Sequence, residues 1–313
     1  MRSNIPMMWF YLSLLPPAIW ACVNTIDKIV VGKYIDRPIV YLIFTGLATL
    51  IPVSLLPLWC NFDKISVSLI LLSIATGSIY IFYTWFFFRS LQISDAPVVA
   101  NLLLLVPVIS LFMGTILFHE RFHIHTYGGI LLVIGGVLGT SFEKREGKNR
   151  TKNWSLTLTP AFVLMFISAI LTSIDYTLEK YILMQTNEIT LFYWNRVGIL
   201  IATGCILLIP KSPRKDFIRT LRFIPHIIPI SLINEILDMT AAFILISAYY
   251  SGPLSLVTAI ISIQPLFVLI FINIVNKIRP NTVPTSGDKK YFLIRFACII
   301  IAVVGIYLIS LTG

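Results

Sequence analysis

Ten long runs of apolar residues divide the chain, and short polar segments separate them. Each run approaches the roughly 20 residues that a helix needs to cross the hydrocarbon core of a bilayer. A bilayer offers no water to exposed backbone groups, so spanning segments of this kind form helices. The pattern therefore predicts ten transmembrane helices, over residues 8–31, 38–59, 66–88, 96–118, 124–141, 156–182, 189–209, 224–249, 252–276 and 292–311.

The composition agrees with an all-α polytopic membrane protein. Of the 313 residues, 57% are hydrophobic and 12% are charged, which is too apolar for a soluble domain of this length. The formal net charge of +10 comes from Lys and Arg residues in the connecting segments, where they set membrane orientation. The basic charge therefore does not indicate nucleic-acid binding. The four cysteines fall within apolar runs and have no metal-ligand or redox spacing.

The two halves of the chain carry related features. The first helix contains Thr25 to Asp27 followed by Lys33 to Ile35, and the sixth contains Ser173 to Asp175 followed by Lys180 to Ile182. Pro107 and Pro265 also stand deep inside the fourth helix of their respective halves. Internal duplication explains both similarities, although the matches are short enough to arise by chance.

This duplication predicts a first half over residues 1–141, a basic linker over 142–155 and a second half over 156–313. Each half has five helices, so the second half must enter the bilayer from the opposite face. The expected fold is therefore ten transmembrane helices as two inverted five-helix repeats, an arrangement typical of secondary transporters.

Three short motifs carry a resemblance to a known family. The pattern N-x-I-D-K occurs at Asn24 to Lys28, L-x-N-E-I-L at Leu232 to Leu237, and Q-P-L-F-V at Gln264 to Val268. With the ten-helix layout, these motifs resemble the EamA-type members of the drug/metabolite transporter superfamily, in particular a bacterial subgroup. The resemblance implies a transport function in two five-helix halves, and it implies no particular substrate.

The segment His119-Glu120-Arg121-Phe122-His123 fits the zinc-protease pattern H-E-x-x-H. Two histidines at this spacing share a helix face, and the glutamate between them can activate a zinc-bound water. The motif stands at a membrane boundary, however, and the nearest extra donor, His125, lies only two residues from His123. We interpret these residues as interfacial and expect neither a metal nor a cofactor. An intramembrane metalloprotease is the alternative from another class.

The eighth predicted helix carries the strongest polar cluster within an apolar run. Ser231, Asn234, Glu235, Asp238 and Ala242 recur at spacings of three and four residues and so share one helix face. At about 1.5 Å per residue, Glu235 and Asp238 lie ~15–20 Å into the helix, near the membrane midplane. Charged groups at this depth are expensive, so we interpret the cluster as a substrate or coupling site. Interhelical packing is the alternative.

Other polar residues extend this candidate site. Arg196 is the only arginine well inside a predicted helix, and we expect it to neutralise one of the acids. Gln264 and Asn101 stand near Pro265 and Pro107, whose missing N–H groups free backbone carbonyls near mid-membrane. Such breaks either line a cavity or form simple kinks.

Asp27 and Asp175 are expected at the ends of their helices and, in an inverted repeat, at opposite membrane surfaces. They are candidate gate residues, with simple interfacial acids as the alternative. Aromatic residues also cluster along the third helix, at Tyr80, Tyr83 and residues 85–88. Helix packing or an interfacial belt is the favoured interpretation, and an aromatic-lined cavity is the alternative.

The sequence therefore predicts a secondary transporter, not an enzyme, in the inner (cytoplasmic) membrane. It would move a small polar or amphipathic metabolite by alternating access, through proton coupling or exchange. No G-x-x-x-x-G-K-[ST] motif occurs, which disfavours ATP-driven transport by this chain alone. The expected partners are a small-molecule substrate and the lipid bilayer, with no nucleic acid. A homodimer, a flippase for a lipid-linked sugar and a non-transporting subunit are open alternatives.

The basic residues also predict an orientation. With ten helices, the membrane side shared by both termini carries only Arg2, Lys64, Arg121 and Lys180, whereas the other side carries nineteen basic residues. The positive-inside rule therefore places the termini outside the cytoplasm. The family resemblance implies the reverse orientation.

Overall fold

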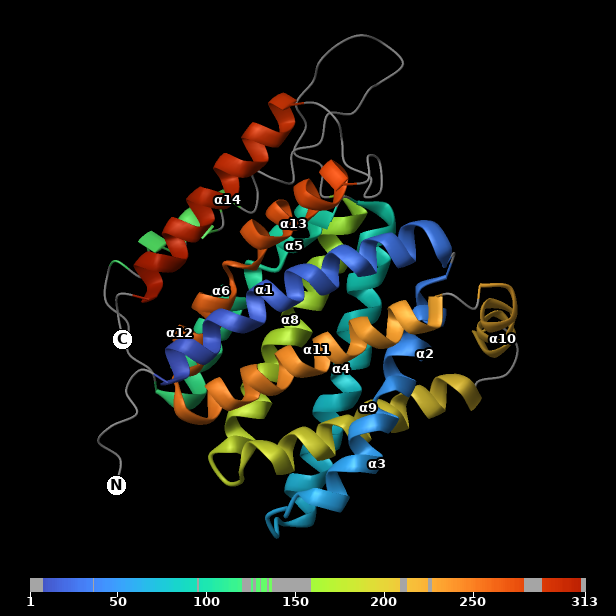
Figure 1. Ribbon diagram of the computed structural model, residues 1–313. Coiled ribbons are helices and arrows are strands. Elements are labelled where there is room, and N and C mark those ends of the chain that lie inside the picture. Colours follow the sequence, from blue (N-terminus) through green and yellow to red (C-terminus); the bar gives the residue numbers. More distant parts are fainter. Residues whose placement is uncertain are drawn as a thin grey trace.

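The computed structural model describes residues 8–35, 37–94, 96–119, 159–208, 213–224, 227–278 and 289–310, with short pieces between 125 and 136. These described residues form helices and no β-strand, which confirms the all-α class. The helices are drawn in Figure 1 and comprise α1 (Met8–Ile29), the π-helical turn η1 (Val30–Tyr34), α2 (Pro38–Ala48), α3 (Leu50–Trp59), α4 (Val67–Ile93), α5 (Ala96–Leu102), α6 (Leu105–Phe118), α8 (Pro160–Leu183), α9 (Glu188–Leu208), α10 (Pro213–Phe223), α11 (Ile227–Ser251), α12 (Leu254–Ile261), α13 (Gln264–Ile278) and α14 (Lys289–Ser310).

Eight helical stretches within the described residues are long and apolar enough to cross a membrane, so the protein is a multi-pass membrane protein. They correspond within a few residues to eight of the ten predicted spans. The predicted span over 124–141 lies largely outside the described residues. The predicted span over 292–311 coincides with α14, in which the described apolar stretch, Phe296–Gly305, is shorter. Ten spans and an inverted repeat therefore stay predictions.

Two spans are broken at corresponding places. Residues 103–104 separate α5 from α6, and residues 262–263 separate α12 from α13. Pro107 and Pro265 lie just beyond these breaks, and a proline cannot donate to the carbonyl four residues earlier. The backbone at each break turns through hydrogen bonds to the carbonyl three residues earlier. The mid-membrane breaks expected from the two prolines are therefore present.

Helices α4 and α9 approach each other closely because small residues stand where they cross. Gly77 of α4 lies against the backbone of Asn195, and Gly198 of α9 lies against the backbone of Ile74. A Cβ atom at either glycine would collide with a carbonyl oxygen of the other helix. Helix α1 also packs along α11, and α4 packs along α8. In Figure 1, α1 and α11 run side by side across the front of this group, which surrounds the middle of the bundle.

Helix α10 was not predicted from the sequence. It joins α9 to α11, is 11 residues long, and carries four basic residues and one acidic residue. In Figure 1 it lies at the right of the bundle, whereas the start of α1 and the end of α14 lie at the left. Both ends of the described chain are thus on one side of the bundle, as an even number of membrane crossings requires.

Candidate functional site

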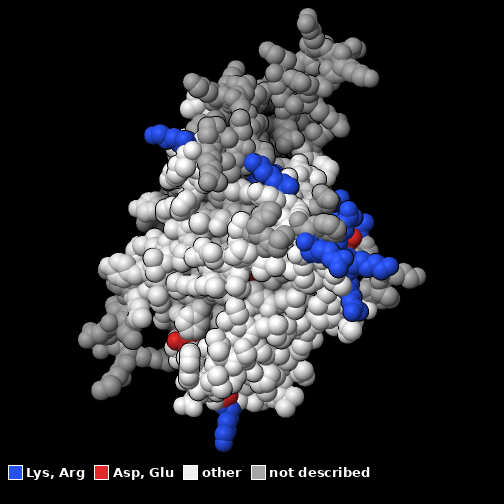
Figure 2. Space-filling view, turned by 45° about the vertical axis from the view of Figure 1, so that its right-hand side comes forward, with Lys and Arg blue, Asp and Glu red and all other residues white. Residues whose placement is uncertain are grey.

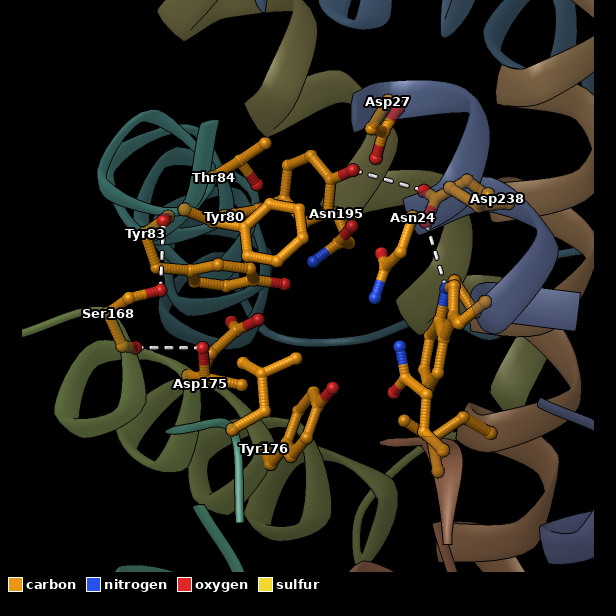
Figure 3. Close-up of a pocket in the computed structure, with 18 of the residues that line it drawn as sticks. Asn24, Asp27, Tyr80, Tyr83, Thr84, Ser168, Asp175, Tyr176, Asn195 and Asp238 are labelled. Carbon is orange, nitrogen blue, oxygen red and sulfur yellow. Dashed lines mark hydrogen bonds between the residues drawn. The ribbon is translucent and has the colours of Figure 1, made fainter. Parts of the chain in front are cut away.

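A cavity of about 120 Å³ lies in the middle of the bundle, between α1, α4, α8, α9, α11 and the start of α13 (Figure 3). A single water occupies roughly 10–15 Å³ on such a scale, so the cavity has room for a small solute. Its aromatic lining comprises Trp20, Tyr80, Tyr83, Phe87, Phe88 and Tyr176. Its polar and charged lining comprises Asn24, Asp27, Thr84, Ser168, Thr172, Asp175, Glu179, Asn195, Arg196, Glu235, Asp238 and Gln264.

Acidic groups outnumber basic ones in this lining. Five carboxyl groups face the cavity, against the single guanidinium of Arg196 on α9. The carboxyl groups belong to Asp27 of α1, Asp175 and Glu179 of α8, and Glu235 and Asp238 of α11. All of them except Asp238 are at most 5% exposed. Burying so many like charges is costly unless protons or cations balance them.

Arg196 does not form the ion pair that we expected from the sequence. Its guanidinium has no carboxylate oxygen within 4.0 Å among the described residues. Its Cζ atom lies 4.6 Å from the centre of the Phe192 ring and 5.7 Å from that of the Tyr80 ring. The Nε atom is buried without a hydrogen-bond partner in the described part of the chain. Aromatic faces therefore make the close contacts of this cation at the cavity wall, and no acid of the described residues pairs with it directly.

The two acids of α11 differ in their surroundings. Asp238 accepts a hydrogen bond from the Trp20 indole at 2.9 Å and another from the Tyr80 hydroxyl at 3.0 Å (Figure 3). Glu235 is 5% exposed, and no side chain of the described residues forms a hydrogen bond or an ion pair with it. A buried acid that faces a cavity without a protein partner is a candidate for binding a solute or a proton.

Asn234 lies behind the cavity wall rather than on it. It is fully buried, and its amide nitrogen donates to Asp27 Oδ1 at 2.7 Å and to the Tyr41 hydroxyl oxygen at 3.0 Å. The Tyr41 hydroxyl itself donates to Asp27 Oδ1 at 2.9 Å. This cluster connects α1 and α2 of the predicted first half to α11 of the predicted second half.

A second cluster has a similar arrangement, in which two helices of the predicted second half meet one helix of the predicted first half. The amide nitrogen of Asn195 lies 3.0 Å from the Thr76 hydroxyl oxygen and 3.5 Å from Glu179 Oε1, and it donates to both. The cluster connects α8 and α9 to α4. In terms of the predicted halves, each cluster joins an acid on the first helix of one half to a polar residue on the second helix of that half and to another on the third helix of the other half.

Two lysines, one in each predicted half, make equivalent contacts. Lys28 of α1 donates to two backbone carbonyl groups at the end of α4, at 2.5 and 2.7 Å. Lys180 of α8 donates to two backbone carbonyl groups at the end of α11, at 2.6 and 2.8 Å. A cation at the C-terminus of a helix satisfies the last carbonyl groups and interacts favourably with the helix dipole.

The structure brings together most of the residues that we predicted for the site. Glu235, Asp238, Arg196 and Gln264 all line the cavity. Asn101 does not line it, because this side chain is fully buried in α5 and donates to the Gly136 carbonyl oxygen at 3.5 Å. Asn101 therefore packs α5 against a neighbouring segment.

The expected positions of Asp27 and Asp175, at opposite membrane surfaces, are wrong. Helix α1 continues through η1 to Tyr34, and α8 continues to Leu183, so each acid lies inside a helix. Both acids line the same cavity (Figure 3). The lysines that follow the acids, Lys28 and Lys180, donate to backbone carbonyl groups of other helices, so they need no contact with water and do not mark the membrane surface.

Glu179 and Asn24 were missed from the sequence. Glu179 follows Asp175 by one helical turn on α8, and Ser168 and Thr172 precede Asp175 at similar spacing. Spacings of three and four residues, which identified the polar face of the eighth predicted helix, also identify this polar face of α8. Asn24 stands three residues before Asp27, on the same face of α1, and Figure 3 shows its side chain at the centre of the view.

The aromatic cluster of the third predicted helix serves two purposes. Tyr80, Tyr83, Phe87 and Phe88 line the cavity, as in the alternative of an aromatic-lined cavity. The other members, at positions 85 and 86, do not line it.

The H-E-x-x-H segment falls mostly outside the described residues. His119 ends α6 in the left-handed conformation, with φ of 54°, and His125 is also described. The residues from Glu120 to His123 are not. Within the described part of the chain, no group of three metal-ligating side chains occurs.

Comparisons with known proteins agree with the family resemblance. Residues 7–142 match the EamA-like transporter family, which confirms the predicted resemblance over the first half of the chain. A solved structure titled "Crystal structure of protein" is similar with a TM-score of 0.56 and 14% sequence identity, over 99% of this chain and 98% of that chain. At this identity the likeness concerns the fold alone. No curated protein matches the chain.

Proposed function

We propose that this chain, whose first half matches the EamA-like transporter family, is a secondary transporter that moves a small polar or amphipathic metabolite across the inner membrane. The observation that carries this proposal is the central cavity, because helices of both predicted halves line it with five carboxyl groups in the middle of the bundle. Intramembrane acids of this kind mark substrate and ion pathways. Inverted-repeat transporters bind their cargo at the interface between halves, at the same depth.

The chemistry of the lining favours a solute with an ammonium group. Glu235 has no protein partner among the described residues, and Asp238 lies one helical turn away from it. A protonated amine can pair with such acids and also stack on the faces of Trp20 and Tyr176. Arg196 offers a binding group for a carboxylate, so amino acids and related zwitterions fit as well as simple amines.

Alternating access is supported by the two hydrogen-bonded clusters. Thr76 of one cluster corresponds to Asn234 of the other, so Gly77 corresponds to Glu235. Gly77 lets α4 lie closely on α9, whereas the corresponding position on α11 carries a carboxylate and faces the cavity. Both junctions border the cavity, and their equivalent positions are packed differently, as expected if the two predicted halves exchange their packing during alternating access.

Coupling follows from charge balance in this proposal. Five acids and one arginine cannot all be charged at low cost inside a bilayer, so protons or a cationic solute must compensate them. Release of the solute then favours uptake of protons or of a second solute, which corresponds to proton-coupled transport or exchange.

A thermal-shift screen of the purified protein tests this function. Ligands that bind the native state raise its apparent stability, so amines and amino acids should raise the melting temperature. Neutral alcohols of the same size, sugars and nucleosides serve as matched comparisons. Stabilisation by neutral solutes alone would refute the proposed ammonium recognition, and stabilisation by polyprenyl-linked sugars alone would favour a flippase.

A further inference from the structure

A basic surface surrounds α10 at one end of the bundle. Four residues of α10, Arg214, Lys215, Arg219 and Arg222, are exposed, and so are Lys33 and Arg37 near the end of η1 and the start of α2. We call these six residues the α10 basic surface. Figure 2 shows blue side chains gathered at the right of the molecule with a single red one among them. Asp216 is the acidic residue of α10.

Helix α10 is fixed against the membrane-spanning bundle. The ring of Phe217 packs on that of Phe44 of α2, with centroids 4.8 Å apart at 61°. Arg37 Nη1 lies 2.8 Å from Asp216 Oδ2 and pairs with it. Because α10 follows α9 and precedes α11 with only a few residues on either side, it must lie close to the membrane boundary.

The outer face of α10 combines apolar and basic side chains. Ile218 is 53% exposed, and the exposed Arg214 and Arg222 stand one turn before and after it on the same face. A surface helix in water gains nothing by exposing isoleucine between two arginines. At the boundary of a bilayer, the isoleucine can enter the acyl region while the arginines reach the phosphate groups.

A pocket of about 470 Å³ opens between α10 and the start of α2. Ile35, Val40 and Ile224 give it an apolar side, and Arg219 gives it hydrogen-bond donors, whereas the Thr220 hydroxyl donates to the Asp216 carbonyl oxygen at 2.9 Å. Arg37 and Asp216 pair with each other in its wall, whereas Arg219 has no ion pair among the described residues. The pocket is therefore basic and amphipathic, with a charged guanidinium left for an anionic group.

We propose that this pocket and the α10 basic surface bind the headgroups of anionic phospholipids. A phospholipid offers a phosphate to Arg219 and acyl chains to the apolar side, and the bilayer supplies it at this depth. Each basic residue near an anionic membrane surface contributes attraction that falls off within a Debye length, so the grouped residues reinforce one another. This inference does not depend on the proposed transport function.

Lipid-dependent stability tests the proposal. The purified full-length protein is melted in detergent micelles with increasing mole fractions of dioleoylphosphatidylglycerol, with dioleoylphosphatidylcholine, or with inorganic phosphate. We expect phosphatidylglycerol to raise the melting temperature and the other two to have little effect. Arg219→Gln should weaken phosphatidylglycerol binding. The mole fraction of this lipid that gives half of the full stabilisation should rise by about tenfold, because a charge-assisted hydrogen bond is lost. Lys64→Gln, an exposed lysine just before α4 and at the end of that helix away from η1, is the control and should keep the wild-type response.

The double variant Arg214→Gln/Arg222→Gln provides a second test if Arg219→Gln does not fold, because both side chains are exposed and support no packing. It should also weaken the phosphatidylglycerol response. Equal stabilisation by phosphatidylcholine would overturn the proposal, and so would a response that both variants retain. Stabilisation by free phosphate as strong as that by the lipid would indicate a soluble anion as the ligand and would equally refute it.

Discussion

The close approach of α4 and α9 makes a sharp prediction about Gly198. A Cβ atom at this position would collide with the Ile74 carbonyl oxygen and would lie 2.8 Å from the Ile74 Cα atom, whereas ordinary contact begins at 3.4 Å. The two helices would have to separate by at least about 0.6 Å, the difference between these distances. Overpacking of this kind costs about 1–3 kcal/mol in the free energy of unfolding.

Gly204 provides the control on the same helix. A Cβ atom there meets nothing within 4 Å, and alanine in a helix is favoured over glycine by about 0.5–1 kcal/mol. We therefore expect Gly204→Ala to be neutral or stabilising and Gly198→Ala to be destabilising. The measurement is the melting temperature of each purified variant in the same detergent. If Gly198→Ala melts at or above the temperature of Gly204→Ala, the inferred packing of α4 on α9 is incorrect.

Three further predictions concern single features. Lys180→Met should lower the melting temperature and speed hydrogen exchange at the end of α11, because two carbonyl groups lose their donor at a cost of about 1–3 kcal/mol; unchanged exchange there would contradict this. A C-terminal reporter that is active only in the cytoplasm should stay dark if charge sets the orientation, and a bright signal would count against it. The double variant His119→Ala/His123→Ala should keep its fold and activity; loss of activity together with stoichiometric zinc would refute the interfacial interpretation.

The sequence predicts the spans well because apolar runs of about 20 residues have few alternatives in a membrane protein. The two proline breaks are also predictable, since Pro107 and Pro265 act on their own local backbone. Helix α10 was missed because it is too short and too charged for a span. Its sequence signals were Pro213 at the first position, Asp216 in the first turn, and Phe217 and Leu221 four residues apart.

Side-chain partners were predictable only in part. The polar face of α11 follows from helical spacing, and it does line the cavity. The partners of Lys28 and Arg196 do not follow from spacing, because Lys28 donates to carbonyl groups of another helix and Arg196 lies against aromatic rings. Charged residues were therefore expected at helix ends or in ion pairs. Both expectations assumed that only water or an opposite charge can satisfy a charged side chain.

The role of Glu235 is the most direct test of the proposed transport site. After the thermal-shift screen has identified a stabilising amine or amino acid, uptake of that labelled compound into proteoliposomes is measured per folded molecule. Glu235→Gln removes the charge and keeps the volume, and Asp238→Asn does the same. Thr240→Val, on the exposed face of α11, is the control and should keep its uptake. We predict that both acid variants lose uptake while they insert and purify as single species. Normal uptake per folded molecule in both would contradict the site and would leave these acids as packing groups.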